Sequence, residues 1–163
     1  MKVAVLRFPG SNCDQDALHS LRDDLGLDAD YLWHGETSLA GFDAVFVPGG
    51  FSYGDYLRCG AMAARSPVMG AVREFAGRGG PVIGACNGFQ ILCESGLLPG
   101  ALLANAEGRF VCRIVELVRE STLGPWMEGV PERISLPIAH GEGRYAADEE
   151  TLDRLEGEGR VAF

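Results

Sequence analysis

Positive charge is scarce in this sequence, which contains a single lysine, Lys2, and 14 lysines and arginines together. Aspartate and glutamate number 23, so the formal net charge is −9. Nucleic acids and anionic membrane surfaces attract clustered positive charge, and the composition therefore argues against both as partners. The acidic runs at 23–24, 148–150 and 156–158 are typical of solvated helix faces.

Long apolar runs are absent as well, since no segment reaches the roughly 18 consecutive apolar residues of a membrane-spanning helix. Lys2 to Phe8 reads as a strand, not as the basic and apolar parts of a signal peptide. The length of 163 residues and the apolar content of 47% predict one domain with an ordinary core. We expect a cytoplasmic protein.

No two cysteines have the C-x-x-C spacing of a zinc or redox motif, and their number is odd. Neither a disulfide framework nor a zinc site is therefore expected. We interpret the cysteines as reduced thiols, of which one is a candidate nucleophile. They are Cys13, Cys59, Cys86, Cys93 and Cys112.

Strand-like and helix-like segments alternate through the first hundred residues. Short apolar runs lie at 2–8, 29–33, 43–47 and 81–85. Helical periods lie at 14–25, 60–76 and 87–94. The alternation predicts an α/β fold, an open and doubly wound sheet, mostly parallel, with helices on both faces. After Gly100, two longer strands at 110–118 and 134–139 have no helix between them, which predicts an antiparallel extension, and 151–155 is a candidate short helix.

The strongest candidate site is the G-x-C-x-G pattern of Gly84–Gly88, with Cys86 at its centre, between an apolar strand and an apolar helix. This is the cysteine form of a nucleophile elbow. The sharp turn exposes the central side chain, and the helix N-terminus favours a thiolate. The N–H of Asn87 is then placed to stabilise an oxyanion. Free cysteines are more often small buried residues, which is our interpretation of Cys93 and Cys112.

A glycine-rich turn, Pro48-Gly49-Gly50, follows a predicted strand and is a second candidate part of the site. In open α/β sheets, ligands bind at the carboxyl ends of the strands. Consecutive glycines let backbone N–H groups face an anion, although an ordinary turn would have the same composition. Beside the elbow, the N–H of Gly50 would complete the oxyanion hole that Asn87 begins.

Four strings carry a resemblance to a known family. They are Phe8–Asp14 (FPGSNCD), Gly49–Arg58 (GGFSYGDYLR), Cys86–Gln90 (CNGFQ) and Ala139–Gly143 (AHGEG). The chain resembles the class I (triad) glutamine amidotransferases over its whole length. Within that class it is similar to the small glutaminase subunit of phosphoribosylformylglycinamidine synthase. The resemblance implies a flavodoxin-like fold.

The resemblance also implies a reaction. Cys86 would attack the carboxamide of glutamine to form a thioester, with the N–H groups of Gly50 and Asn87 holding the oxyanion. Gly49 and Gln90 would lie beside the bound glutamine. The ammonia would pass to a large subunit that uses ATP and Mg to convert formylglycinamide ribonucleotide to formylglycinamidine ribonucleotide, and a small third subunit would bridge the two. No cofactor or metal is implied for this subunit.

One motif of the family is missing. The family carries a Pro-His-Pro-Glu string that supplies the general base and its orienting acid, and no such string occurs among these 163 residues. The family's chains run on beyond this length, so we expect a domain truncated at its C-terminus. The histidines present are His19, His34 and His140. His140 and Glu142 repeat the His-x-Glu spacing and are a possible base, though not the favoured one, because the family has this string in addition to its catalytic pair.

Three other functions are compatible with the motifs. One is a catalytically incomplete module that binds the partners of the same complex. Another is a glutaminase that serves a different acceptor. The third is a cysteine hydrolase of the peptidase and chaperone type, but Gln90 and Gly49-Gly50 favour glutamine hydrolysis over it.

Overall fold

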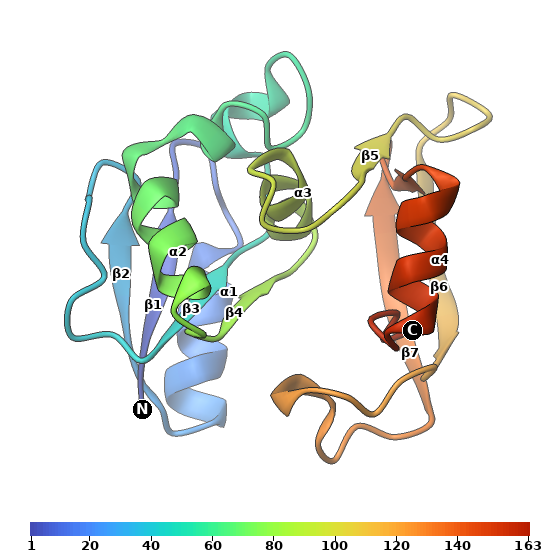
Figure 1. Ribbon diagram of the computed structural model, residues 1–163. Helices are drawn as coiled ribbons and strands as arrows, with labels where there is room; N and C mark the ends of the chain where they lie inside the picture. Colours follow the sequence, from blue (N-terminus) through green and yellow to red (C-terminus); the bar gives the residue numbers. More distant parts are fainter. The chain divides into compact units, whose positions relative to one another are not determined.

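The computed structural model describes residues 1–163, except for the side chain of Pro125. The chain forms two compact units, Met1–Leu98 and Pro99–Phe163 (Figure 1). Each unit has its own sheet or sheets. Among the described residues, no helix combines the length and the apolar character needed to cross a bilayer.

The first unit is built on a four-stranded sheet with the order β2-β1-β3-β4, in which every pairing is parallel. The strands are β1 (Lys2–Arg7), β2 (Asp28–Trp33), β3 (Ala44–Val47) and β4 (Val82–Gly84). The chain leaves β1 toward β2 on one side and returns to β3 on the other. The carboxyl ends of β1 and β3 therefore form a topological switch point, where ligands bind in this kind of sheet.

Helices cover both faces of this sheet, as the alternation of segments predicted (Figure 1). Val3 and Val5 of β1 pack with Leu18 on one face, while Ala4 and Leu6 pack toward the opposite face. Alternate strand residues point to opposite faces, so a fully buried strand needs this continuous apolar run. The helices are α1 (Asp14–His19), which continues as a π-helical turn (Ser20–Asp24), α2 (Pro67–Gly77) and α3 (Asn87–Glu94).

The helix predicted over 60–76 is shorter in the structure, since α2 begins only at Pro67. Proline favours the first turn of a helix because its φ is already helical and it needs no N–H acceptor there. Upstream, Gly60 has a φ of 80°, which ends any continuous helix. Short 3₁₀ turns (Ser52–Asp55 and Ala63–Arg65) fill the connection from β3.

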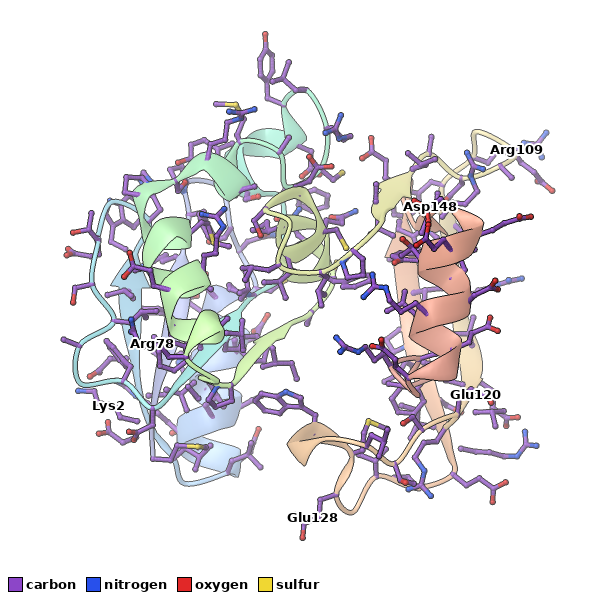
Figure 2. The ribbon with its side chains drawn as sticks, viewed as in Figure 1. Lys2, Arg78, Arg109, Glu120, Glu128 and Asp148 are labelled. Carbon is purple, nitrogen blue, oxygen red and sulfur yellow. The ribbon has the colours of Figure 1, made fainter. Side chains whose placement is uncertain are left out.

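The second unit contains the predicted antiparallel extension. Strands β6 (Val111–Val118) and β7 (Arg133–His140) form a long ribbon, and β5 (Ala101–Leu103) pairs with β8 (Arg144–Ala146). A 3₁₀ turn (Pro125–Met127) lies between β6 and β7. Helix α4 (Glu149–Gly157) begins after Asp148, labelled in Figure 2, whose carboxylate accepts a 2.7 Å hydrogen bond from the Thr151 N–H. This bond holds the pKa of Asp148 below its ordinary value.

Candidate active site

Cys86 occupies the turn between β4 and α3, where the sequence predicts a nucleophile elbow. Its backbone has a φ of 54° and a ψ of −116°, and its side chain is exposed. A positive φ is unfavourable for a residue with a β-carbon and costs on the order of 1–3 kcal/mol. Such strain persists only where the surroundings impose it, so the fold holds this cysteine in a fixed and exposed position.

Two glycines allow the elbow to form. A β-carbon on Gly88 would lie 1.9 Å from the carbonyl oxygen of Val47, and one on Gly84 would lie 2.7 Å from Leu92 Cδ1. The first turn of α3 therefore packs directly on the backbone of β3, closer than any side chain permits. This contact brings the elbow to the carboxyl end of β3.

The glycine-rich turn after β3 lies directly against Cys86. A β-carbon on Gly49 would be 3.2 Å from Cys86 Cβ. Gly50 has a φ of 117°, and a β-carbon there would be 2.4 Å from Asn12 Oδ1. Position 50 therefore requires glycine for its backbone conformation, while glycine at position 49 leaves room for the close approach of the cysteine.

The two predicted oxyanion donors belong to these adjoining turns. In the described part of residues 1–98, the backbone N–H groups of Gly50 and Asn87 have no hydrogen-bond acceptor. The N–H groups that follow in the first turn of α3 have acceptors. Gly88 donates to the Ala85 carbonyl oxygen at 2.8 Å, and Phe89 and Gln90 donate to the Cys86 carbonyl oxygen at 3.0 and 3.2 Å. Free N–H groups at a helix start are suited to stabilise negative charge.

A buried hydrogen-bond network ties the turn after β3 to α3. The Asn87 side chain is 1% exposed, and its Oδ1 accepts hydrogen bonds from Ser52 Oγ at 2.6 Å and Ser52 N at 3.3 Å. Its Nδ2 donates to Gln90 Oε1 at 3.0 Å and to Asp55 Oδ1 at 3.3 Å. The sequence pattern indicated a role only for the backbone of Asn87 and none for Ser52 and Asp55. The available signal was their place in the string 49–58.

A second anchor holds the same loop through Tyr53. This residue has a φ of 55°, and its N–H donates to the Pro9 carbonyl oxygen at 2.6 Å. Its hydroxyl lies within hydrogen-bonding distance of His34 Nδ1 (3.0 Å) and Ser66 Oγ (3.1 Å). His34 is thus part of the loop's support, and the loops after β1, β2 and β3 are connected.

His140 and Glu142 lie in the second unit, at the turn between β7 and β8. The Asn105 amide donates through Nδ2 to the carbonyl oxygens of Arg109 and His140, at 2.8 and 2.9 Å. These bonds fix the amide orientation, so Asn105 Oδ1 is the acceptor that faces His140 Nδ1 at 2.9 Å. The imidazole therefore donates from Nδ1 and helps to shape this turn.

The remaining cysteines differ in environment. Cys93 is buried, as predicted, and burial, followed by the charge of Glu94, raises the pKa of its thiol to about 11. The prediction that Cys112 is a core residue is wrong, because its side chain is exposed. Residues two apart on a strand share a face, and Ile114 on the same face is 75% exposed, so nothing covers that side of the ribbon among the described residues.

The fold and the cysteine elbow together define a class of protein, the glutamine amidotransferases with a cysteine nucleophile on an open parallel sheet. A family model described as the CobB/CobQ-like glutamine amidotransferase domain matches residues 1–163. The subunit PurQ of phosphoribosylformylglycinamidine synthase from Bradyrhizobium diazoefficiens is 60% identical over 166 residues, which cover all of this chain and 71% of that protein. The corresponding subunit of Thermus thermophilus is 59% identical, with 72% of its length covered.

Solved structures of related proteins also match this chain. The chain matches a structure of PurLQS from Thermotoga maritima with a TM-score of 0.85 and 44% identity, over 91% of this chain and 70% of that one. A protein described as part of a GMP synthase, from Thermoplasma acidophilum, matches at a TM-score of 0.61, but its 17% identity supports the fold alone. The chain belongs to the glutamine amidotransferase family, in the branch that contains the PurQ subunits of phosphoribosylformylglycinamidine synthase.

Proposed function

We propose that this chain hydrolyses L-glutamine to glutamate and ammonia, as the glutaminase subunit of phosphoribosylformylglycinamidine synthase. The observation that carries the proposal is the strained and exposed Cys86, with the Gly49 backbone directly against it. A nucleophile needs an accessible position, and the developing oxyanion needs donors that are already oriented. The elbow supplies the first requirement, and the two adjoining turns supply candidates for the second.

In the proposed reaction, the Cys86 thiolate attacks the carboxamide carbon of glutamine, and a carbon–sulfur bond forms. The electron pair of the carbonyl moves to oxygen, which the N–H groups of Gly50 and Asn87 stabilise. Collapse of this intermediate breaks the carbon–nitrogen bond and releases ammonia once the nitrogen is protonated. Water then attacks the thioester and releases glutamate. Gly49 and Gln90 are proposed to contact the bound glutamine.

We do not propose His140 and Glu142 as the general base and its partner. The ground is the resemblance: the family has this string in addition to its own catalytic pair, and in this chain the Nδ1 of His140 is hydrogen-bonded to Asn105. The contacts of Asn105 with the His140 carbonyl oxygen and ring support a structural role for His140 in this turn.

The acceptor of the ammonia is proposed from the relatives. Their name specifies phosphoribosylformylglycinamidine synthase, and the matched solved structure is of PurLQS. We propose that this chain acts in the cytoplasm with two partners: a large ATP- and Mg-using subunit, which converts formylglycinamide ribonucleotide to formylglycinamidine ribonucleotide, and a small subunit that bridges the other two. By contrast, a module that only binds these partners would retain the turn at 48–50 but would have no use for a strained cysteine.

An active-site label tests the nucleophile. A diazo- or chloroketone analogue of glutamine should alkylate Cys86 first, because it is an exposed thiol at a helix start beside the candidate oxyanion donors. Glutamine should protect it, and peptide mapping should locate the label. Exposed Cys112 is the internal control for general thiol reactivity. Labelling of Cys112 at the same rate, or no protection by glutamine, would contradict the proposal.

A further inference from the structure

Cys13 is a second cysteine beside the elbow, and the glutaminase reaction gives it no role. It lies at the end of the turn after β1, immediately before α1, and is partly exposed. A β-carbon on Gly49 would be 3.2 Å from Cys86 Cβ and 3.7 Å from Cys13 Cβ. Both cysteine β-carbons thus lie within 4 Å of one point, although the residues are far apart in the sequence.

The space between the two cysteines is open because residue 49 is a glycine. Any side chain at this position would fill the point that both β-carbons approach. The two β-carbons are therefore at most about 7 Å apart, and a disulfide, whose β-carbons lie about 3.5–4.5 Å apart, requires the turn that precedes α1 to close by up to about 3 Å. Gly10 and Asn12 in this turn are exposed, whereas Asp14 at the start of α1 is 2% exposed and forms an ion pair with Arg7, so the closure involves the turn and not α1.

The environment of Cys13 reflects the same geometry. Burial is the main cause that raises the pKa of the Cys13 thiol, and the neighbouring groups Asp16, Cys86 and Asp14 raise it further. Cys13 is partly exposed, whereas Cys86 is exposed. Peroxide therefore reaches Cys86 more readily, which suits an attacking Cys86 and a resolving Cys13.

We propose that Cys13 is the resolving partner of Cys86, and that hydrogen peroxide converts the pair to a reversible disulfide. The inference concerns the oxidation chemistry of the elbow and does not depend on the identity of the ammonia acceptor. While the disulfide exists, the nucleophile is blocked. Reduction by a thiol restores it.

The chemistry proceeds in two balanced steps. The Cys86 thiolate attacks one peroxide oxygen, the oxygen–oxygen bond breaks, and hydroxide leaves to become water with one proton, which gives a sulfenic acid. The Cys13 sulfur then attacks the Cys86 sulfur, the sulfur–sulfur bond forms, and the sulfur–oxygen bond breaks. The released hydroxide takes the Cys13 proton and leaves as a second water. The two thiols lose two electrons in total, and the peroxide gains them.

The test is non-reducing peptide mapping of the reduced full chain after treatment with one equivalent of hydrogen peroxide. Trypsin places Cys13 in the peptide 8–22 and Cys86 in the peptide 79–109. The expected product is a linked pair of these peptides, with sequencing of the fragments assigning the bond to Cys86 and not to buried Cys93. The linked pair should disappear in Cys13→Ser and persist in Cys59→Ser, the matched control at another partly exposed cysteine.

Recovery of glutaminase activity gives a second readout. After peroxide and then dithiothreitol, the chain should recover at least about fivefold more of its untreated activity than Cys13→Ser, in which Cys86 proceeds to irreversible sulfinic acid. The proposal would be overturned if, in the unmodified chain, Cys13 still reacts with an alkylating reagent after Cys86 has become sulfinic acid. This measurement needs no variant, so it holds even if Cys13→Ser fails to fold. A linked pair in a chain without glutaminase activity would instead contradict the proposed function.

Discussion

Single residues determine how the elbow is held, and the sequence revealed only part of this. Cys86 and its flanking glycines could be predicted because a strained turn between a strand and a helix needs small residues at fixed spacings. The bond between Ser52 and Asn87 could not, because it joins side chains 35 positions apart and depends on the packing of α3 against β3. Cys112 was predicted to be a core residue because free cysteines are usually buried. It is exposed, because no described residue covers its side of the ribbon formed by β6 and β7.

The Ser52 hydroxyl offers a test at this scale. In Ser52→Ala, Asn87 Oδ1 loses its 2.6 Å bond inside the protein, and the turn that carries Gly50 is held less firmly. We expect kcat for glutamine hydrolysis to fall by about 10- to 100-fold with a smaller change in KM, since misplacement of about 1 Å can cost two orders of magnitude. The exposed Ser38→Ala should change neither constant. A rise in KM alone would show that Ser52 supports substrate binding and not the alignment of the turn.

At the scale of elements, the four parallel strands follow from short apolar runs, because a strand covered on both faces needs apolar residues throughout. The start of α2 was misplaced by seven residues because 60–66 has apolar spacing like a helix. Gly60 packs so closely on α3 that a β-carbon would lie 2.8 Å from Ile91 N, and it takes a positive φ. The spacing of apolar residues along the chain carries no information about this tertiary contact. Pro67, however, is a residue that favours the first turn of a helix and could have indicated the start of α2.

The packing of α3 on β3 predicts the effect of a single methyl group. Gly88→Ala would put a β-carbon 1.9 Å from the Val47 carbonyl oxygen, so the helix must move off the strand. We expect the free energy of unfolding to fall by on the order of 3 kcal/mol in urea denaturation.

The matched control is Gly70→Ala in α2, where an added β-carbon meets nothing within 4 Å. Alanine in an exposed helix interior should stabilise by about 0.5–1 kcal/mol relative to glycine. Equal changes in both variants would show that the contact between α3 and β3 is looser than described.

At the scale of the whole molecule, the alternation of strands and helices stops near Gly100, and a boundary between two compact units lies close to this point. The parallel unit ends at Leu98, and the antiparallel strands begin in the next unit. Length and composition predict one domain over 1–163, which stays a prediction, because they report total size and not how contacts are divided between the two units. The candidate site is carried by 1–98, where the motifs with strict glycine requirements lie, and His140 is used within 99–163.

The most direct measurement compares two nitrogen donors in the complex of this chain with its synthase partners. Formation of formylglycinamidine ribonucleotide is followed with glutamine or with ammonium, for the unmodified chain and for Cys86→Ala, with Cys112→Ser as the control. We expect Cys86→Ala to lower the glutamine-supported rate by at least about a thousandfold and to leave the ammonium-supported rate within about twofold. Glutamine-supported synthesis that survives Cys86→Ala would show that Cys86 is not the nucleophile.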